Sequence, residues 1–249
     1  ECGMQRFDMT MKSHAMDLEE VRRVGGDTVP LLDARTRAKI RRAKREYSAL
    51  GELCVETASS VVQGLEWFDS LEMLHQKRWI AKGEPGCFSN PRFVRFHRMM
   101  IARNHENGRA LVMRVNVGSA ALGYLYGFVD RERFYLYQCG FDYDMVERNS
   151  MPGLVCHVLA MQALAAKGLK MYDFMAGSSR YKSALSNIEE SMTWTHFRSY
   201  SIRFCVIEHI NPVLTKMRFH KRRLLMAFES IRARLTYLGT ASETANQGV

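Results

Sequence analysis

The stretch from Phe134 to Lys182 is the part of this sequence that most limits the possible fold. A tyrosine-rich run over 134–141 has the composition of a strand, and Pro152-Gly153 opens a helical pattern that ends before Gly168. A short apolar strand over 170–174 leads into a polar turn, which gives the order of a βαβ unit. Ligands bind at the carboxyl ends of such strands, where the helix N-terminus offers backbone N–H groups to an anion.

Composition favours a folded protein that works in a reducing setting. Hydrophobic residues make up 47% of the 249 residues, and no apolar run reaches the roughly 18 residues that span a bilayer. The widely scattered cysteines fit a reduced cytosolic setting, so we expect a cytoplasmic protein, with membrane association as the alternative. The six scattered cysteines lack the spacing of a zinc site or a disulfide framework, so we expect no metal. They are Cys2, Cys54, Cys87, Cys139, Cys156 and Cys205.

Two segments carry much of the net charge of +10. Residues 35–45 hold seven basic side chains and no acidic one, and residues 216–234 hold seven against Glu229 alone. These runs fit solvated helix faces, contacts to phosphate ligands, an acidic polymer such as tRNA, or an anionic membrane surface. Neither run contains a nucleic-acid motif, so we do not expect DNA binding.

The remaining pattern predicts three parts of the chain. Residues 1–32 are predicted to be irregular, as in a remnant of a preceding domain, because Gly25-Gly26 and Pro30 break any regular element. Residues 33–202 form the main domain, and residues 203–249 form a basic amphipathic helix and tail. The predicted helices are 33–50, 59–82, 91–105, 152–167 and 181–185, and the predicted strands are 52–57, 110–117, 121–129, 134–141, 170–174 and 192–202.

This order resembles the GNAT acyltransferase superfamily, and more narrowly its CelD-like branch, which is related to the FemABX aminoacyl transferases. Two motifs upstream are similar to the same branch, namely 74–79 and the basic helix over 37–45. The motifs that carry the resemblance are Gly140-Phe141-Asp142, Pro152-Gly153-Leu154, Ala166-Lys167-Gly168, Tyr172-Asp173-Phe174 and Gly177 through Tyr181-Lys182.

The resemblance implies an α+β fold in three layers. A mixed, mostly antiparallel central sheet would carry helices on both faces and split at a V-shaped gap between strands 134–141 and 170–174. Acyl-CoA would lie in this gap as co-substrate. The residues implied to hold it are Cys139, Gly140, Phe141, Arg148, Asn149, Ser150, Met151, Gly153 and Leu154.

The loop over 148–153 departs from the superfamily pattern, which is rich in glycine. Only Gly153 remains, and Pro152 removes a backbone donor. The acyl carrier therefore stays open between CoA, acyl carrier protein and aminoacyl-tRNA.

Three residues are candidates for catalysis. Tyr181 resembles the superfamily tyrosine that protonates the departing thiolate, although an aromatic anchor would look the same in sequence. Asp173 lies in a buried strand pattern, so it either pairs with Arg180 or Lys182 or serves as a base. Asp142 could also act as a base, or it could cap its turn.

The acceptor side is predicted from residues on two segments. His75, Arg78 and Trp79 could line it, with a core position as the alternative for Trp79. Lys182 could hold a substrate phosphate or carboxylate, or it could be a surface lysine, and His157 fits a core histidine better than a catalytic one.

Together these residues favour an acyltransferase that moves an acyl group directly from a thioester to an amine or a sugar hydroxyl, as in polysaccharide or cell-envelope biosynthesis. One alternative is a FemABX-like transferase that uses aminoacyl-tRNA. The other is a degenerate GNAT domain that only binds a partner.

Overall fold

The computed structural model describes residues 4–146, 151–177 and 179–199, which group into two compact units. Residues 9–194 form one unit. The described part of the other unit comprises 4–8 and 195–199, where the Thr195 hydroxyl donates to the Asp8 carboxylate at 2.6 Å. The basic helix predicted within 203–249 and the loop residues Arg148, Asn149 and Ser150 lie outside the described residues.

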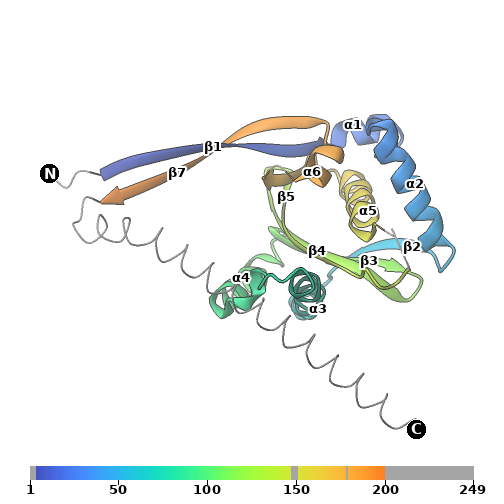
Figure 1. Ribbon diagram of the computed structural model, residues 1–249, viewed down its shortest axis with the longest axis horizontal. Helices are drawn as coiled ribbons and strands as arrows, with labels where there is room; N and C mark the ends of the chain where they lie inside the picture. Colours follow the sequence, from blue (N-terminus) through green and yellow to red (C-terminus); the bar gives the residue numbers. More distant parts are fainter. Residues whose placement is uncertain (1–3, 147–150, 178, 200–249) are drawn as a thin grey trace, which may run out of the picture. The chain divides into compact units, whose positions relative to one another are not determined.

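A single mixed sheet has the strand order β2-β3-β4-β5-β6-β1-β7 (Figure 1). Strands β2 through β5 form an antiparallel meander, β5 and β6 pair in parallel, and β6 pairs antiparallel with β1. The mostly antiparallel mixed sheet of the predicted α+β fold is therefore confirmed. The strands are β1 (Met4–Asp17), β2 (Leu53–Thr57), β3 (Ala110–Val117), β4 (Ala120–Asp130), β5 (Arg133–Phe141), β6 (Met171–Ala176) and β7 (Ile188–Ser199).

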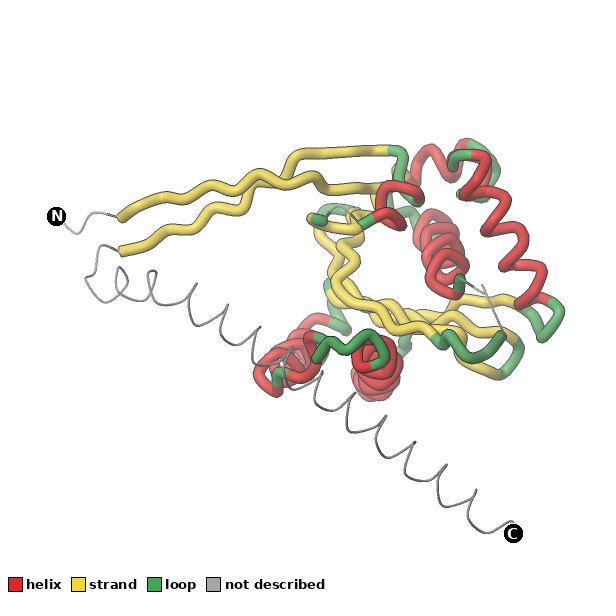
Figure 2. The backbone as a smooth tube through the Cα atoms, viewed as in Figure 1, coloured by secondary structure: helices red, strands yellow, loops and turns green. Residues whose placement is uncertain are grey.

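Helices cover both faces of the sheet, as the tube in Figure 2 shows. Helix α5 packs with α1 and α2 on one face, and α3 packs with α4 on the other. The helices are α1 (Leu18–Arg23), α2 (Ala34–Ser48), α3 (Val61–Ile80), α4 (Pro91–Asn104), α5 (Pro152–Ala166) and α6 (Arg180–Ala184), with short 3-10 turns at Val29–Leu31 and Cys87–Ser89.

Alternation along the central strands produces two separate apolar cores. On β3, Met113 and Val115 face the core under α5, whereas Val112 faces the core under α3 and α4. On β4, Leu125 and Tyr126 point to opposite cores in the same way. Successive side chains of a strand point to opposite faces, and helices cover both faces of this sheet. The central strands therefore need apolar residues at odd and at even positions.

Strands β5 and β6 separate after a short parallel contact. They pair only at three positions, from Arg133 opposite Met171 to Tyr135 opposite Asp173. Beyond that point β5 continues to Phe141 against β4 alone, while β6 pairs with β1. The predicted split of the sheet is confirmed, and it opens on the side toward the N-terminus of α5.

The prediction that residues 1–32 are irregular is wrong. Residues 4–31 contain β1, α1 and a 3-10 turn, and Asp17 caps α1 by accepting from the backbone N–H groups of Glu19 and Glu20. The physical reason is that β1 is held by partners far along the chain, with Met16 paired to Tyr172 and buried in the core. Local sequence patterns carry no signal for such a pairing.

Helix α3 approaches the sheet closely at Gly140. A Cβ built on Gly140 would overlap the Leu71 carbonyl oxygen and lie 3.1 Å from the Leu74 Cβ. The residue lacks a side chain because the backbone of α3 occupies that space. This contact fixes the last turns of α3 against the end of β5.

Candidate functional site

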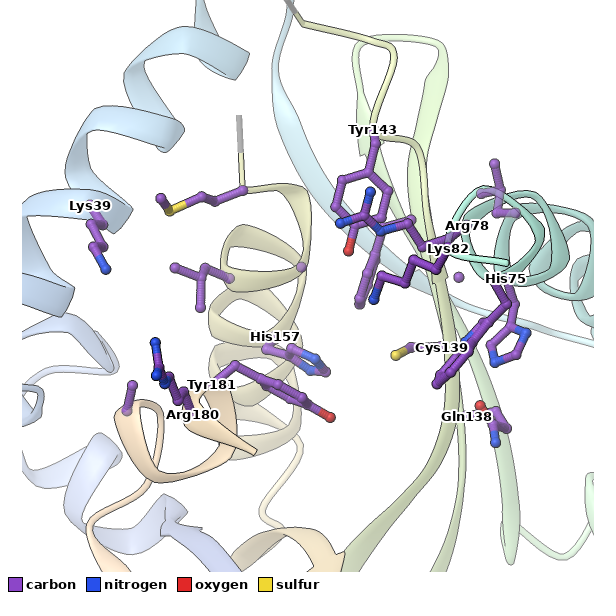
Figure 3. A pocket seen from close by; sticks show the side chains of 18 of the residues that line it. Lys39, His75, Arg78, Lys82, Gln138, Cys139, Tyr143, His157, Arg180 and Tyr181 are labelled. Carbon is purple, nitrogen blue, oxygen red and sulfur yellow. The ribbon is translucent and has the colours of Figure 1, made fainter. Parts of the chain in front are cut away.

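A cavity of about 550 Å³ lies beside the part of β5 that β6 leaves unpaired (Figure 3). Four helices and the end of β5 contribute to its wall. The lining residues are Thr36 and Lys39 of α2; Leu74, His75, Arg78 and Trp79 of α3, followed by Lys82; Gln138, Cys139, Gly140 and Phe141 of β5, followed by Tyr143; Met151, Gly153, Leu154 and His157 at the start of α5; and Arg180, Tyr181 and Ala184 of α6.

The N-terminus of α5 reaches the cavity through Met151, Gly153 and Leu154. Met151 precedes the helix in the left-handed conformation, with φ of 43°, and no side chain of the described residues caps this helix end. Gly153 packs against Phe141, where an added Cβ would lie 3.0 Å from the ring. Pro152 has no N–H and the Leu154 N–H donates to the Met151 carbonyl at 3.0 Å, so this helix start offers an anionic group the Gly153 N–H together with the helix dipole.

Tyr181 places a phenol in the cavity. Its ring stacks on the His157 imidazole, with centroids 5.5 Å apart and planes 10° apart, and meets Phe174 edge-on at 5.9 Å. Figure 3 shows its hydroxyl directed across the cavity toward the side of Cys139. Burial raises the pKa of this phenol well above its ordinary value, so the hydroxyl keeps its proton at neutral pH.

His157 forms the support beneath Tyr181. It is 1% exposed, and its Nδ1 lies 2.8 Å from the Tyr172 hydroxyl. Burial, with a smaller effect of the Lys182 charge, lowers the pKa of His157 to about 3. The imidazole is therefore neutral and structural, as the sequence favoured, although its edge also lines the cavity.

The cavity wall is cationic. Lys39, Arg78, Lys82 and Arg180 line it, and none of the lining residues that the structure describes is an aspartate or a glutamate. Among the described residues, none of these four cations forms a salt bridge. Unpaired cations around a concave surface attract an anionic ligand.

The cysteines near the cavity are not activated as nucleophiles. Burial raises the pKa of Cys139 to about 12 and that of Cys87 to about 11. The Cys87 sulfur lies 3.8 Å from the His75 Nε2, but the thiol remains protonated at neutral pH.

Asp173 lies outside the cavity and is held by structural contacts. It is 1% exposed, and it accepts hydrogen bonds from the Ser13 hydroxyl at 3.0 Å and from the Met175 backbone N–H at 2.6 Å. Its ion-pair partner is Arg133, at 3.6 Å, and not Arg180 or Lys182. The sequence suggested a buried ion pair, and the structure adds Arg133 as the closest cation through the parallel β5–β6 pairing, while the Lys182 charge also interacts with Asp173.

Asp142 and Lys182 also lie outside the residues that line the cavity. Asp142 accepts from the Asp144 backbone N–H at 2.8 Å, which is the turn-capping role considered from sequence. The Lys182 ammonium donates to the Ala176 carbonyl at 2.8 Å and so closes the end of β6. Both side chains are thus engaged in local backbone contacts.

The cavity gathers ten of the residues predicted for the site. They are Tyr181, Cys139, Gly140, Phe141, Met151, Gly153, Leu154, His75, Arg78 and Trp79. Sequence reasoning missed Lys39 and Arg180 as lining residues. Lys39 was inside the basic run and could have been found from its position next to the buried face of α2, which contains Thr36 and Ile40.

Two kinds of feature are not found in the part of the chain that the structure describes. No group of three or more histidine, cysteine or acidic side chains could hold a metal ion. Likewise, none of the helices over 4–146, 151–177 and 179–199 combines the length and the hydropathy of a bilayer-spanning segment.

Comparison with solved structures finds the same fold in distant proteins. FemX is 12% identical, with a TM-score of 0.53 over 80% of this chain and 63% of the FemX chain. The C-terminal domain of a putative lysylphosphatidylglycerol synthetase from Agrobacterium fabrum is 17% identical, with a TM-score of 0.43 over 74% of this chain and 52% of that one. This chain thus spans less than two thirds of either protein, and the likeness to FemX at 12% identity shows the fold alone.

Sequence comparisons give a more definite result for the family. Curated protein sequences contain no match to the chain. The model of the acetyltransferase (GNAT) domain matches residues 34–183, more than half of the chain, and this range covers every residue that lines the cavity except Ala184. The protein belongs to the GNAT acetyltransferase domain family.

Proposed function

We propose that this protein transfers an acyl group from an acyl-CoA thioester directly to an amine or a hydroxyl group of a small or saccharide acceptor. The observation that carries the proposal is the cavity at the split of the sheet, in which the Tyr181 hydroxyl is held protonated beside the end of β5. A neutral phenol at this position is suited to protonate a leaving thiolate.

The choice of CoA as carrier rests on charge and on the start of α5. Lys39 and Arg180 line the same cavity as the helix N-terminus at Gly153, which no side chain over 4–146, 151–177 or 179–199 caps. Cationic side chains together with backbone N–H donors suit the phosphates of CoA, even though the loop before α5 contains proline in place of a second glycine.

The reaction needs no covalent enzyme intermediate. The acceptor attacks the thioester carbonyl, the C–S bond breaks, and the departing sulfur takes the proton of the Tyr181 hydroxyl. The acceptor's own proton passes to solvent, from which the Tyr181 phenolate then regains a proton. Cys139 is the only thiol among the described lining residues, and its raised pKa keeps it protonated and therefore a poor nucleophile. This agrees with direct transfer, in which no acyl-enzyme forms.

One observation favours a second candidate, transfer from aminoacyl-tRNA. Helix α2 contributes Thr36 and Lys39 to the cavity, and Arg35, Arg41 and Arg45 of the same helix are exposed. A tRNA end that entered the cavity could therefore contact these arginines. We rank this candidate second because a row of exposed cations on a helix is also typical of a solvated face.

A thermal-shift comparison tests the proposal. Free CoA, acetyl-CoA and a long-chain acyl-CoA should each raise the melting temperature, since a ligand at 100 times its Kd stabilises the folded state by about 2.7 kcal/mol. The variant Lys39→Gln/Arg180→Gln should lose most of this shift. The absence of a shift with all three ligands would contradict the choice of CoA as carrier.

A further inference from the structure

Arg78 and Lys82 bring two cations to the cavity from the end of α3. They are four residues apart around the C-terminus of the helix, and both line the cavity. Figure 3 shows them together with Tyr143 on the side of β5, whereas Lys39 and Arg180 come from the opposite side of α5. Tyr181 and His157 lie between the two groups.

Neither cation is neutralised by the described residues around it. The Arg78 guanidinium lies 4.2 Å from the centre of the Tyr143 ring, and the Lys82 ammonium lies 5.3 Å from that of Trp79. These aromatic contacts hold the side chains in place and leave their charge available to a ligand.

The nearest carboxylates on the adjoining turn are already engaged. Asp144 forms its ion pair with Lys77, the neighbour of Arg78, and Asp142 accepts from the Asp144 backbone. Lys77 and Arg78 both lie in the last turn of α3, where a cation stabilises the helix dipole, and Lys77 does so without lining the cavity. Stability of the helix therefore does not explain why two further cations line the cavity.

The position of Tyr181 decides which substrate these cations serve. If the thioester sulfur lies at the Tyr181 hydroxyl and the CoA phosphates lie toward Lys39, Arg180 and the start of α5, the side with Arg78 and Lys82 is left for the acceptor. We infer that the acceptor carries an anionic group, best matched by a phosphate, which Arg78 and Lys82 bind. This inference rests on the proposed function and adds a substrate class to it.

Phosphate is the preferred anion because of its charge and geometry. A phosphate monoester carries close to two negative charges at neutral pH and offers three acceptor oxygens, enough for a guanidinium fork and an ammonium at once. A single carboxylate would balance only one of the two cations.

Binding measurements with a matched pair of sugars test the inference. The probes are glucosamine and glucosamine 6-phosphate, measured by calorimetry with and without saturating CoA. Glucosamine 6-phosphate should bind at least tenfold more tightly than glucosamine to the unmodified protein. Equal binding of the two sugars would overturn the inference.

Three double variants test which cations produce the preference for the phosphorylated sugar. Arg78→Gln/Lys82→Gln should remove the preference for the phosphorylated sugar and leave the affinity for free CoA within threefold. Lys39→Gln/Arg180→Gln should weaken CoA binding and keep the preference. Arg92→Gln/Arg95→Gln, which removes two exposed cations of α4 outside the cavity lining, should change neither property.

Two further outcomes separate this inference from the proposed function. Loss of CoA binding in Arg78→Gln/Lys82→Gln would assign these cations to the donor and overturn the inference. Failure of the unmodified protein to bind CoA would contradict the proposed donor, while a phosphate preference that depends on Arg78 and Lys82 would still support the anion site.

Discussion

The ring of Tyr181 rests on the imidazole of His157, parallel to it within 10° and with centroids 5.5 Å apart. His157 is fixed in turn by the Tyr172 hydroxyl, 2.8 Å from its Nδ1. A buried strand residue, Tyr172, thus sets the position of an exposed helix residue, Tyr181, through one neutral histidine. A neutral support adds no positive charge that would lower the pKa of the phenol.

The buried histidines should make stability fall in mild acid. Burial lowers the pKa of His97 to about 4 and that of His157 to about 3, below the unfolded value of about 6.5. Their contribution is present above pH 6.5 and is lost as the pH falls toward the folded values. Urea unfolding at pH 7 and pH 5 should show a loss of about 2 kcal/mol for each histidine.

His97→Gln isolates half of this effect, because His97 lies in the core under α4 and does not line the cavity. The absolute stability of the variant will fall, so the relevant quantity is the difference in unfolding free energy between pH 7 and pH 5. We expect that difference to shrink by about 2 kcal/mol. An unchanged difference would contradict the role given to His97.

Gly140→Ala should destabilise the fold and disturb the site. The new methyl group would overlap the Leu71 carbonyl, so α3 must shift, at a cost of about 1–3 kcal/mol. Because α3 also carries His75 and Arg78, activity should fall as well. Gly64→Ala in the same helix is the control. Its Cβ would meet only ordinary contacts at 3.5 Å or more, and denaturant unfolding should show equal or higher stability.

Gly153→Asp should weaken CoA binding by tenfold or more, about 1.4 kcal/mol, because it adds negative charge where phosphate would meet backbone N–H groups. Part of any effect comes from packing, since a Cβ here would lie 3.0 Å from the Phe141 ring. Gly153→Ala measures that part alone. Calorimetry should show a larger loss for the aspartate variant than for the alanine variant; equal losses would place the phosphates elsewhere.

The exposed arginines of α2 distinguish the two candidate donors. If CoA is the donor, retention of tRNA at physiological salt should be weak, and Arg41→Gln/Arg45→Gln should not change it. Tight retention that falls steeply with salt and is lost in this variant would favour aminoacyl-tRNA, because phosphate contacts release counterions.

Most of the fold could be predicted because its signals are local. Asp33, Ser60 and Asn90 cap α2, α3 and α4 near the predicted positions, and the strand over 110–117 has the predicted bounds. Strand β1 could not be predicted in the same way. Its place in the sheet depends on pairing with residues about 160 positions away.

The residues of the candidate site fall into the same two groups, those placed by local signals and those placed by contacts between distant parts of the chain. Residues on the βαβ unit, such as Tyr181 and Gly153, reach the cavity as expected because one short unit positions them. Asp173 paired differently, since its partner Arg133 is a neighbour only across parallel strands. Lys39 comes from a helix far from this unit in sequence, and only the packing of α2 beside α5 brings it to the same cavity.

The most direct test of the central claim is the rate of thiol release by Tyr181→Phe. This variant keeps the ring that stacks on His157 and removes only the hydroxyl. With an acceptor drawn from pooled amines, sugars and sugar phosphates, we expect kcat to fall about 100-fold or more while donor affinity changes little, because the lost interaction forms in the transition state. Full activity in Tyr181→Phe, with CoA binding intact, would contradict the role of this hydroxyl as the acid that protonates the leaving thiolate.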